Sequence, residues 1–297
     1  MAFLPGIAYL TRKYVIPSII LQFLHDCPCY NILMNIVFPE FNNPIIQEAL
    51  ARHAEMRQTS EPIPGITEQG VSEITALAAP DLTAACTMVK SGQADTMIAG
   101  IDYSSRDVIL ACKEHLGLSG HTFSGLAVMQ RDREIYLLAD MAACKHPSKD
   151  QLVEIIHQTH ASASKLFTEP PRVALLSFST FGSGGRDDTI ELMQTVRQEF
   201  QDSEILLDGE MQLDAAVNPV VAQKKFPNSP VAGHANVLIV PDLNSGNILY
   251  KAFEHIAGFH VAGPILQGFN FPVSDLSRGS SIADIILTIE VMAKLAA

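Results

Sequence analysis

The stretch FPVSDLSRGSS, residues 271–281, places an acid, a serine, an arginine and a glycine within five consecutive positions. A second acid, Asp284, follows seven residues after Ser277. An anionic ligand of an acidic chain would need a local cluster of arginines or backbone amides, and Arg278 is one such cation. A solvated surface turn has the same polar composition, and the residue types alone favour that structural interpretation.

Two other polar loops follow apolar runs. They are LSFSTFGSGG (176–185) and PDLNSGN (241–247). The first leads towards a helix expected from Asp187, and backbone amides at a helix N-terminus attract phosphate; a flexible turn with capping serines explains it equally well. In the second, Asp242 and Asn244 can bond to the backbone of their own loop, which favours a structural role.

Strands and helices alternate from residue 35 onwards, which is typical of an α/β fold with parallel-type sheets. Ligands of such sheets bind beyond the carboxyl ends of strands, so the loops that follow strands are the candidate binding loops. The expected strands are 35–39, 94–100, 124–130, 134–140, 172–179, 204–209 and 235–242, with 124–140 forming a hairpin. The expected helices are 43–57, 81–92, 105–117, 148–167, 186–200, 246–258 and 282–297.

The composition supports this fold class and excludes some partners. The chain has 297 residues, of which 47% are apolar and 18% charged, and it has no tryptophan. A core of Val, Ile, Leu and Ala suits covered parallel strands, and the length fits two domains better than one. The net charge of −12 argues against a general nucleic-acid or anionic-membrane surface. Five cysteines without zinc-module spacing indicate reduced thiols in the cytoplasm.

Residues 1–33 are expected to be an N-terminal extension, because MNIVFPEFNNP from Met34 predicts the first core strand. The stretch YVIPSIILQFL (14–24) follows Arg12 and Lys13 and is similar to the apolar part of a signal peptide. It is too short to span a bilayer, and no small-x-small cleavage pattern follows it. An exported protein is the alternative to a cytoplasmic protein with an extension.

Four long motifs are VALLSFSTFGSG (173–184), DGEMQLDAAV (208–217), SPVAGHANVLIVPDLNSGNILYK (229–251) and GPILQGFNFPVSDLSRG (263–279). In this order and at this spacing, they resemble the phosphotransacetylase family. The likeness runs continuously from QADTMIAG (93–100) to residue 297, with a thinner match at IVFPEFNNPIIQEAL (36–50). DGEMQLDAA is more similar to the acetyl-specific branch than to the phosphate butyryltransferase branch.

The resemblance implies reversible transfer of an acetyl group between coenzyme A and inorganic phosphate, which gives acetyl phosphate in acetate metabolism. The family uses no metal and no covalent acyl-enzyme, so coenzyme A is expected as a substrate and no cofactor is expected. His157 and His160 have no third ligand nearby, and no metal site is predicted. The expected partners are small-molecule substrates and a second copy of the chain in a cytoplasmic homodimer, with no nucleic acid and no membrane.

The family fold is two α/β domains with the active site in the cleft between them. Both chain ends contribute to one domain. The resemblance therefore assigns domain I to residues 34–122 and 266–297, shortened relative to the family, and domain II to residues 123–265, with 1–33 as the extension.

The family motif places its catalytic serine, arginine and aspartate at Ser277, Arg278 and Asp284. Ser277 can donate to the carbonyl oxygen as that oxygen gains negative charge, and Arg278 can hold the phosphoryl group. Asp284 is the expected base for the thiol of coenzyme A, provided that burial in a closed cleft raises its pKa. The substrate-binding residues implied are Ser179, Thr180, Gly182, Ser183, Gly184, Asn244 and Arg106.

The sequence also departs from the family pattern. Ile45 and Leu110 stand where the family carries arginines, and Arg106 and Lys113, one helical turn away, are the expected replacements. These losses leave open a non-catalytic paralogue that binds phosphate or acyl phosphate and regulates a partner. A phosphate butyryltransferase is a further alternative, because acyl chain length depends on the shape of the pocket.

Overall fold

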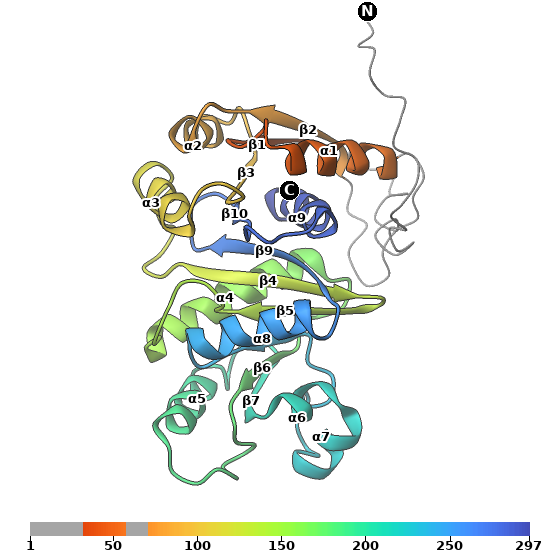
Figure 1. The fold of residues 1–297 in the computed structure, drawn as a ribbon. Helices are drawn as coiled ribbons and strands as arrows, with labels where there is room; N and C mark the ends of the chain where they lie inside the picture. Colours follow the sequence, from red (N-terminus) through yellow and green to blue (C-terminus); the bar gives the residue numbers. More distant parts are fainter. Residues whose placement is uncertain (1–31, 58–70) are drawn as a thin grey trace, which may run out of the picture.

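The computed structural model of the protein describes residues 32–57 and 71–297 (Figure 1). In this part of the chain, one mixed sheet of ten strands runs through the molecule. In sheet order the strands are β2 (Val71–Ala78), β1 (Ile32–Phe38), β3 (Thr96–Ala99), β10 (Val273–Asp275), β9 (His260–Gln267), β4 (Ser124–Arg131), β5 (Glu134–Ala139), β8 (Val237–Ile239), β6 (Val173–Leu176) and β7 (Leu207–Met211).

Strand direction reverses in the middle of this sheet. β2, β1, β3 and β10 are parallel, β9 is antiparallel to both β10 and β4, and β5 is antiparallel to β4. β5, β8, β6 and β7 are again parallel to one another. The sheet therefore has two opposite rims at which strands end. β1, β3, β10 and β4 end at the first, which we call the β10 rim. β5, β6, β7, β8 and β9 end at the opposite one, the β6 rim.

Helices cover both faces of the sheet and enclose three apolar clusters. One face packs against α1, α4, α5 and α9, and the other against α2, α3, α6, α7 and α8 (Figure 1). The helices are α1 (Pro44–Arg57), α2 (Leu82–Lys90), α3 (Ser105–His115), α4 (Lys149–Leu166), α5 (Asp188–Glu199), α6 (Leu213–Val217), α7 (Pro219–Lys225), α8 (Leu243–His255) and α9 (Ile282–Ala296).

Several helices begin where the sequence offers a capping side chain. Asp81 accepts a hydrogen bond from a backbone amide of the first turn of α2, and Asp242 does so for α8. Ser148 and Gln151 satisfy each other's backbone amides at the start of α4, which forms a capping box. These caps satisfy amides that have no partner within the helix.

Helix α9 lies in the core, where it contacts α1, α4 and β9. Every residue from Asp284 to Leu295 is buried, as expected for a helix surrounded by protein. Its Glu290 is hydrogen-bonded to His53 of α1 at 2.5 Å, and Arg57 Nε lies 4.0 Å away. Burial alone would raise the pKa of Glu290, but the His53 hydrogen bond and the neighbouring cations bring it below its usual value.

The predicted α/β class is confirmed, and each strand and helix predicted from the sequence is present. The predicted parallel-type sheets form one continuous mixed sheet, because β4 and β9 pair across the middle. β10 and α9 lie beside β3 and α1, and the domain assignment stays a prediction. The extension predicted at 1–33 lies outside the described residues apart from Ile32 and Leu33, which already belong to β1.

Five elements were not predicted: β2, β9, β10, α6 and α7. β10 has three residues and α6 has five, too few for a periodic pattern to show. β9 contains the pair Gly263–Pro264, which ordinarily argues against a strand. Most of β2 is only partly buried, because it is the edge strand, so its apolar alternation is weak.

Candidate active site

A carboxylate at the β10 rim organises the ends of three strands. Glu40 follows β1 and is 7% exposed. Its two oxygens accept hydrogen bonds from four consecutive backbone amides, those of residues 100–103 after β3, at 2.9, 3.2, 2.5 and 2.8 Å. A single side chain therefore fixes the whole loop that follows β3.

The same loop is in contact with the end of β10. Leu276 donates its amide to the carbonyl oxygen of Ala99 at 2.6 Å. Gly100 has φ +111, and a Cβ there would lie 2.5 Å from Leu276 O and 2.6 Å from Asp275 Oδ1. Only glycine fits this approach, so the loop after β3 holds the end of β10 in place.

The predicted catalytic turn follows directly. The amide of Ser280 donates to the carbonyl oxygen of Ser277 at 2.9 Å, which closes a turn over residues 277–280. Ser277 is half-buried, and Arg278 is exposed at the apex of the turn. Arg106 is exposed in the first turn of α3. Its neighbour Ser105 lies close enough to the Asp275 carboxyl to lower the pKa of that acid, which brings the start of α3 to the same rim.

Asp275 is a buried acid beneath this turn. It is 2% exposed, and its Oδ1 has no hydrogen-bond partner in the described part of the chain. Burial raises the pKa of this carboxyl to about 6, and the negative charge of Glu40 acts in the same direction. The neighbouring Ser105 and the Arg278 charge oppose the increase. This carboxyl therefore changes charge slightly below neutral pH.

Asp284 is buried as well, but its surroundings favour the ionised form. Oδ2 accepts from the amide and hydroxyl of Ser281 at 2.9 and 2.5 Å, and Oδ1 accepts from the amide of Val261 at 3.0 Å. Burial would raise its pKa, but the neighbouring His260 and hydrogen bonds from Ser281 and Val261 bring the pKa below its usual value. The condition of a raised pKa is therefore not met in this structure, where hydrogen bonds outweigh burial, and a catalytic role for Asp284 stays a prediction.

The loop after β6 is held by its own hydrogen bonds. Ser179, fully buried, donates its hydroxyl to Glu210 Oε1 at 2.9 Å and accepts from the amide of Gly184 at 2.9 Å. The amide of Gly182 donates to the same Glu210 oxygen at 2.6 Å, and Gln194 donates to the other at 3.1 Å. Ser179 thus shapes the loop in this structure, and its binding role stays a prediction.

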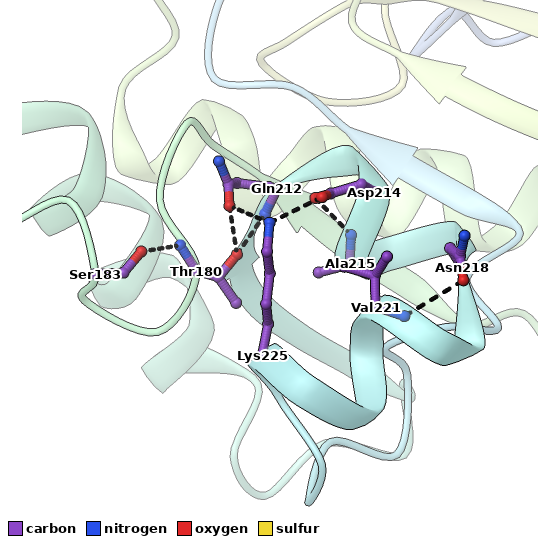
Figure 2. Close-up of polar contacts among 8 residues, drawn as sticks. All are labelled: Thr180, Ser183, Gln212, Asp214, Ala215, Asn218, Val221 and Lys225. Carbon is purple, nitrogen blue, oxygen red and sulfur yellow. Dashed lines mark hydrogen bonds and ion pairs between the residues drawn. The ribbon is translucent and has the colours of Figure 1, made fainter.

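Figure 2 shows how the same loop is joined to α6 and α7. The Thr180 hydroxyl oxygen accepts a hydrogen bond from the backbone amide of Gln212 at 3.0 Å. The backbone amide of Thr180 donates to the Ser183 hydroxyl, also at 3.0 Å. Lys225 donates to the side chains of Gln212 and Asp214, each at 2.8 Å. The Lys225 hydrogen bond is the main reason why the pKa of Asp214 is lowered.

The predicted site residues thus fall into two groups. Ser277, Arg278, Asp284 and Arg106 come together at the β10 rim. The loop of residues 179–184 and Asn244, exposed in the first turn of α8, follow β6 and β8 at the opposite rim. Within one chain, the structure does not bring the two groups to the same rim.

The two positions without the family's arginines differ from each other. Ile45 packs against the apolar core. Leu110 is 50% exposed and lies one helical turn after Arg106, so these two side chains share a face of α3. The Lys113 ammonium lies 4.2 Å from the centre of the Phe123 ring and is engaged there. Arg106 is therefore the better candidate for a replacement.

Neither a metal-binding cluster nor a membrane-spanning helix is found in residues 32–57 and 71–297. No group of three His, Cys, Asp or Glu side chains there is arranged to hold a metal ion. His157 packs against the Phe200 ring with 5.2 Å between ring centres. Burial, aided by His157, lowers the pKa of His160. Across these residues, no helix has the length and apolar character needed to cross a membrane.

Three residues at the β10 rim were not predicted as site residues from the sequence: Glu40, Asp275 and His260. Glu40 and Asp275 each stand at the carboxyl end of a strand, a signal that could have marked them as site residues. His260 begins a strand that was not predicted, so nothing in the sequence placed it beside Asp284.

The fold and the rim define an α/β protein that presents a serine–arginine turn at the ends of parallel strands, next to a buried helix start. Residues 33–293 match the family described as phosphate acetyl/butaryl transferase. The chain belongs to this family, which confirms the resemblance found in its motifs.

Individual relatives of the chain have names that place them in the same family. The chain is 40% identical over 205 residues to a phosphate acetyltransferase of Bacillus subtilis, covering 67% of this chain and 62% of that protein. It is 36% identical over 269 residues to a phosphate acetyltransferase of Helicobacter pylori, covering 89% and 50%. A phosphotransacetylase structure from Streptococcus pyogenes superposes with a TM-score of 0.71 at 30% identity, covering 89% of this chain and 94% of that one. The chain spans less than two thirds of either acetyltransferase.

Replacing Glu40 by glutamine is expected to lower the free energy of unfolding by about 2–4 kcal/mol. The substitution removes charge-assisted hydrogen bonds, worth about 1.5–3 kcal/mol each, and sets an amide donor against backbone donors. Urea denaturation measures the change. Glu114→Gln, on the exposed side of α3, is the matched control. Equal stability of the two variants would refute the organising role of Glu40.

Asp275→Asn is expected to stabilise the protein at neutral pH. The pKa of Asp275 is about 6 in the folded protein, whereas the ordinary value is 3.8. Ionisation of this carboxyl therefore destabilises the folded state. The effect is complete above about pH 6 and absent below about pH 4. Asparagine cannot ionise, so the variant should gain about 2–3 kcal/mol at pH 7.5 and nothing at pH 4. Urea denaturation at both pH values tests this, with the exposed Asp202→Asn as control. A gain that does not change with pH contradicts it.

Proposed function

We propose that the protein transfers an acetyl group reversibly between coenzyme A and inorganic phosphate, forming acetyl phosphate. The observation that carries this proposal is the turn at residues 277–280, which presents Arg278 at the end of β10 beside Ser277 and the start of α9. Family membership and relatives named phosphate acetyltransferase support the acetyl group as the one transferred.

The proposed mechanism assigns a separate role to each group. The Arg278 guanidinium holds the phosphoryl oxygens through paired hydrogen bonds. The Ser277 hydroxyl donates to the carbonyl oxygen, which becomes negative when the thiolate of coenzyme A attacks the acetyl carbon. The bond from that carbon to the phosphate oxygen then breaks, and phosphate leaves. The thiol proton is accepted by the site around Asp284, whose carboxylate is ionised before the reaction begins, and it passes on to the departing phosphate.

We further propose that the protein acts in acetate metabolism as a cytoplasmic homodimer. Cys86, Cys112 and Cys144 are all unpaired, as expected in a reducing compartment. The loop after β6 exposes 59% of Phe178 and 63% of Phe181. Large apolar side chains exposed together support contact with a second copy of the chain.

Thiol release from acetyl-coenzyme A in the presence of phosphate tests the activity directly. We expect phosphate-dependent release by the full chain, and slower release when butyryl-coenzyme A replaces the acetyl compound. Complete lack of turnover at saturating substrate would contradict the proposal and favour a non-catalytic paralogue. Faster turnover of the butyryl compound would show a phosphate butyryltransferase.

Arg278→Ala is expected to lower kcat/KM by about a hundredfold or more, because a charge-assisted pair of hydrogen bonds to phosphate is lost. The protein should stay folded, since Arg278 is exposed. The assay is the same thiol release, with phosphate varied. Arg133→Ala, an exposed arginine between β4 and β5, is the matched control and should leave the rate unchanged. Comparable rates of both variants would remove Arg278 from the site.

Leu110→Arg is expected to lower the KM for coenzyme A by about tenfold, the effect of one charge-assisted contact. The side chain is half-exposed and shares a face with Arg106, so an arginine can be accommodated without burying its charge. Initial rates at varied coenzyme A measure the change. Glu114→Gln changes the charge of this helix by the same one unit and serves as control. An equal effect of both substitutions would indicate a general charge effect.

A further inference from the structure

The surroundings of Asp284 raise a chemical difficulty for the proposed reaction. A thiol ordinarily loses its proton at a pKa of about 8.5. A good proton acceptor has a pKa close to the working pH. Burial would raise the pKa of Asp284, but the neighbouring His260 and hydrogen bonds from Ser281 and Val261 lower it below its usual value. A carboxylate stabilised in this way accepts a proton poorly, so another group is needed.

A histidine stands beside this carboxylate. His260 is the first residue of β9, and its Nδ1 lies 3.6 Å from Asp284 Oδ1. Its side chain is 33% exposed, whereas that of Asp284 is 7% exposed. The nitrogen that faces the carboxylate is Nδ1, so Nε2 is the nitrogen left to meet a substrate. Imidazole is also the side chain whose proton affinity is matched to neutral pH.

A buried amide borders the same position. Gln130 of β4 is directly opposite His260 in the antiparallel pairing, so their side chains emerge on the same face. Gln130 is 1% exposed, and neither its amide nitrogen nor its amide oxygen has a hydrogen-bond partner in the described part of the chain. Buried polar groups are nearly always hydrogen-bonded, so this amide marks a position suited to a polar ligand beside His260.

His260 lies at the same rim as the serine–arginine turn. β9 is paired with β10, and its first residue is at the rim where β10 ends. Ser281, which binds Asp284 through both its amide and its hydroxyl, comes three residues after Arg278. The imidazole, the carboxylate and the turn are therefore joined through one short loop.

Other charged groups around His260 come from two elements besides α9. Glu254 and His255 stand at the end of α8, and Glu254 is near enough to Asp284 for their charges to interact. In the β4–β5 hairpin, Arg131 is paired with Glu134 and lies 4.5 Å from the centre of the Phe259 ring. Arg131 and Glu134 largely neutralise each other, and Asp284 is the charged group that the structure places against the imidazole.

We infer that His260 is the proton acceptor for the coenzyme A thiol, with Asp284 holding its Nδ1 and leaving Nε2 free to take the proton. This inference rests on the proposed acetyl transfer. The S–H proton moves to Nε2, the thiolate sulfur bonds to the acetyl carbon, and the carbon–oxygen bond to phosphate breaks. The phosphate leaves with the electron pair of that bond, and the imidazolium returns its proton to phosphate or water. In the reverse direction, the imidazolium protonates the departing thiolate.

The test is the pH dependence of thiolysis of acetyl phosphate by the full chain and by His260→Gln. At pH 6.5 we expect the variant to be slower by about a hundredfold or more, the usual contribution of a general base. The defect should shrink by about tenfold for each pH unit up to about 8.5, because the thiol then ionises without help. A residue that only supports the fold would give a defect independent of pH.

Three further variants are compared with His260→Gln. His255→Gln replaces a neighbouring histidine that is 64% exposed, and it should keep the wild-type rate. Asp275→Asn removes a carboxyl whose pKa burial raises to about 6, yet the acidic limb of the wild-type profile should persist in this variant. His260→Asn provides a second replacement of the imidazole, and urea denaturation of each variant shows whether it is folded.

The outcomes separate the inference from the proposed function. No turnover by the wild type would overturn both. An active wild type whose pH profile is unchanged in both folded His260 variants would overturn the inference alone. Loss of the acidic limb in Asp275→Asn, with its retention in the His260 variants, would assign the proton to Asp275 instead and would also overturn it.

Discussion

One carboxylate fixes the geometry on which the candidate site depends. Glu40 gathers the amides of residues 100–103, and that loop in turn holds the end of β10 through Gly100 and Leu276. Each hydrogen bond joins only two neighbouring loops. Together these bonds align the ends of β1, β3 and β10, which come from distant parts of the chain. Without this alignment, neither the turn at Arg278 nor the start of α9 would have a fixed position.

The reversal of strand direction in the sheet decides which residues can act together. Ser277, Arg278, Asp284 and His260 share the β10 rim, whereas the loop of residues 179–184 is held at the other rim by Glu210. That loop also exposes Phe178 and Phe181. This apolar surface fits the proposed contact with a second copy of the chain, and the binding role of the loop stays a prediction.

Sequence reasoning predicted the fold class well, because the apolar runs of β4, β5 and β6 and the periodic helices α4 and α9 are long and regular. The family motif placed Ser277, Arg278 and Asp284 together, and they are close along the chain. Sequence reasoning failed for β9 and β10, where a Gly–Pro pair and a three-residue length obscure the pattern. His260 therefore could not be placed beside Asp284, and burial alone gave the wrong direction for the pKa of that acid.

The position of β9 and β10 in the sheet also governs how the chain assembles. They stand in the centre, between β3 and β4, although they follow these strands by well over a hundred residues. Thr96 bonds to the carbonyl of Pro272, for example, across a separation of 176 residues. Such non-local pairing gives a high contact order and slow folding. Until it forms, β3 and β4 present open edges on two incomplete half-sheets, and open edges template aggregation. The segment that carries the serine–arginine turn is thus also the one that closes the sheet.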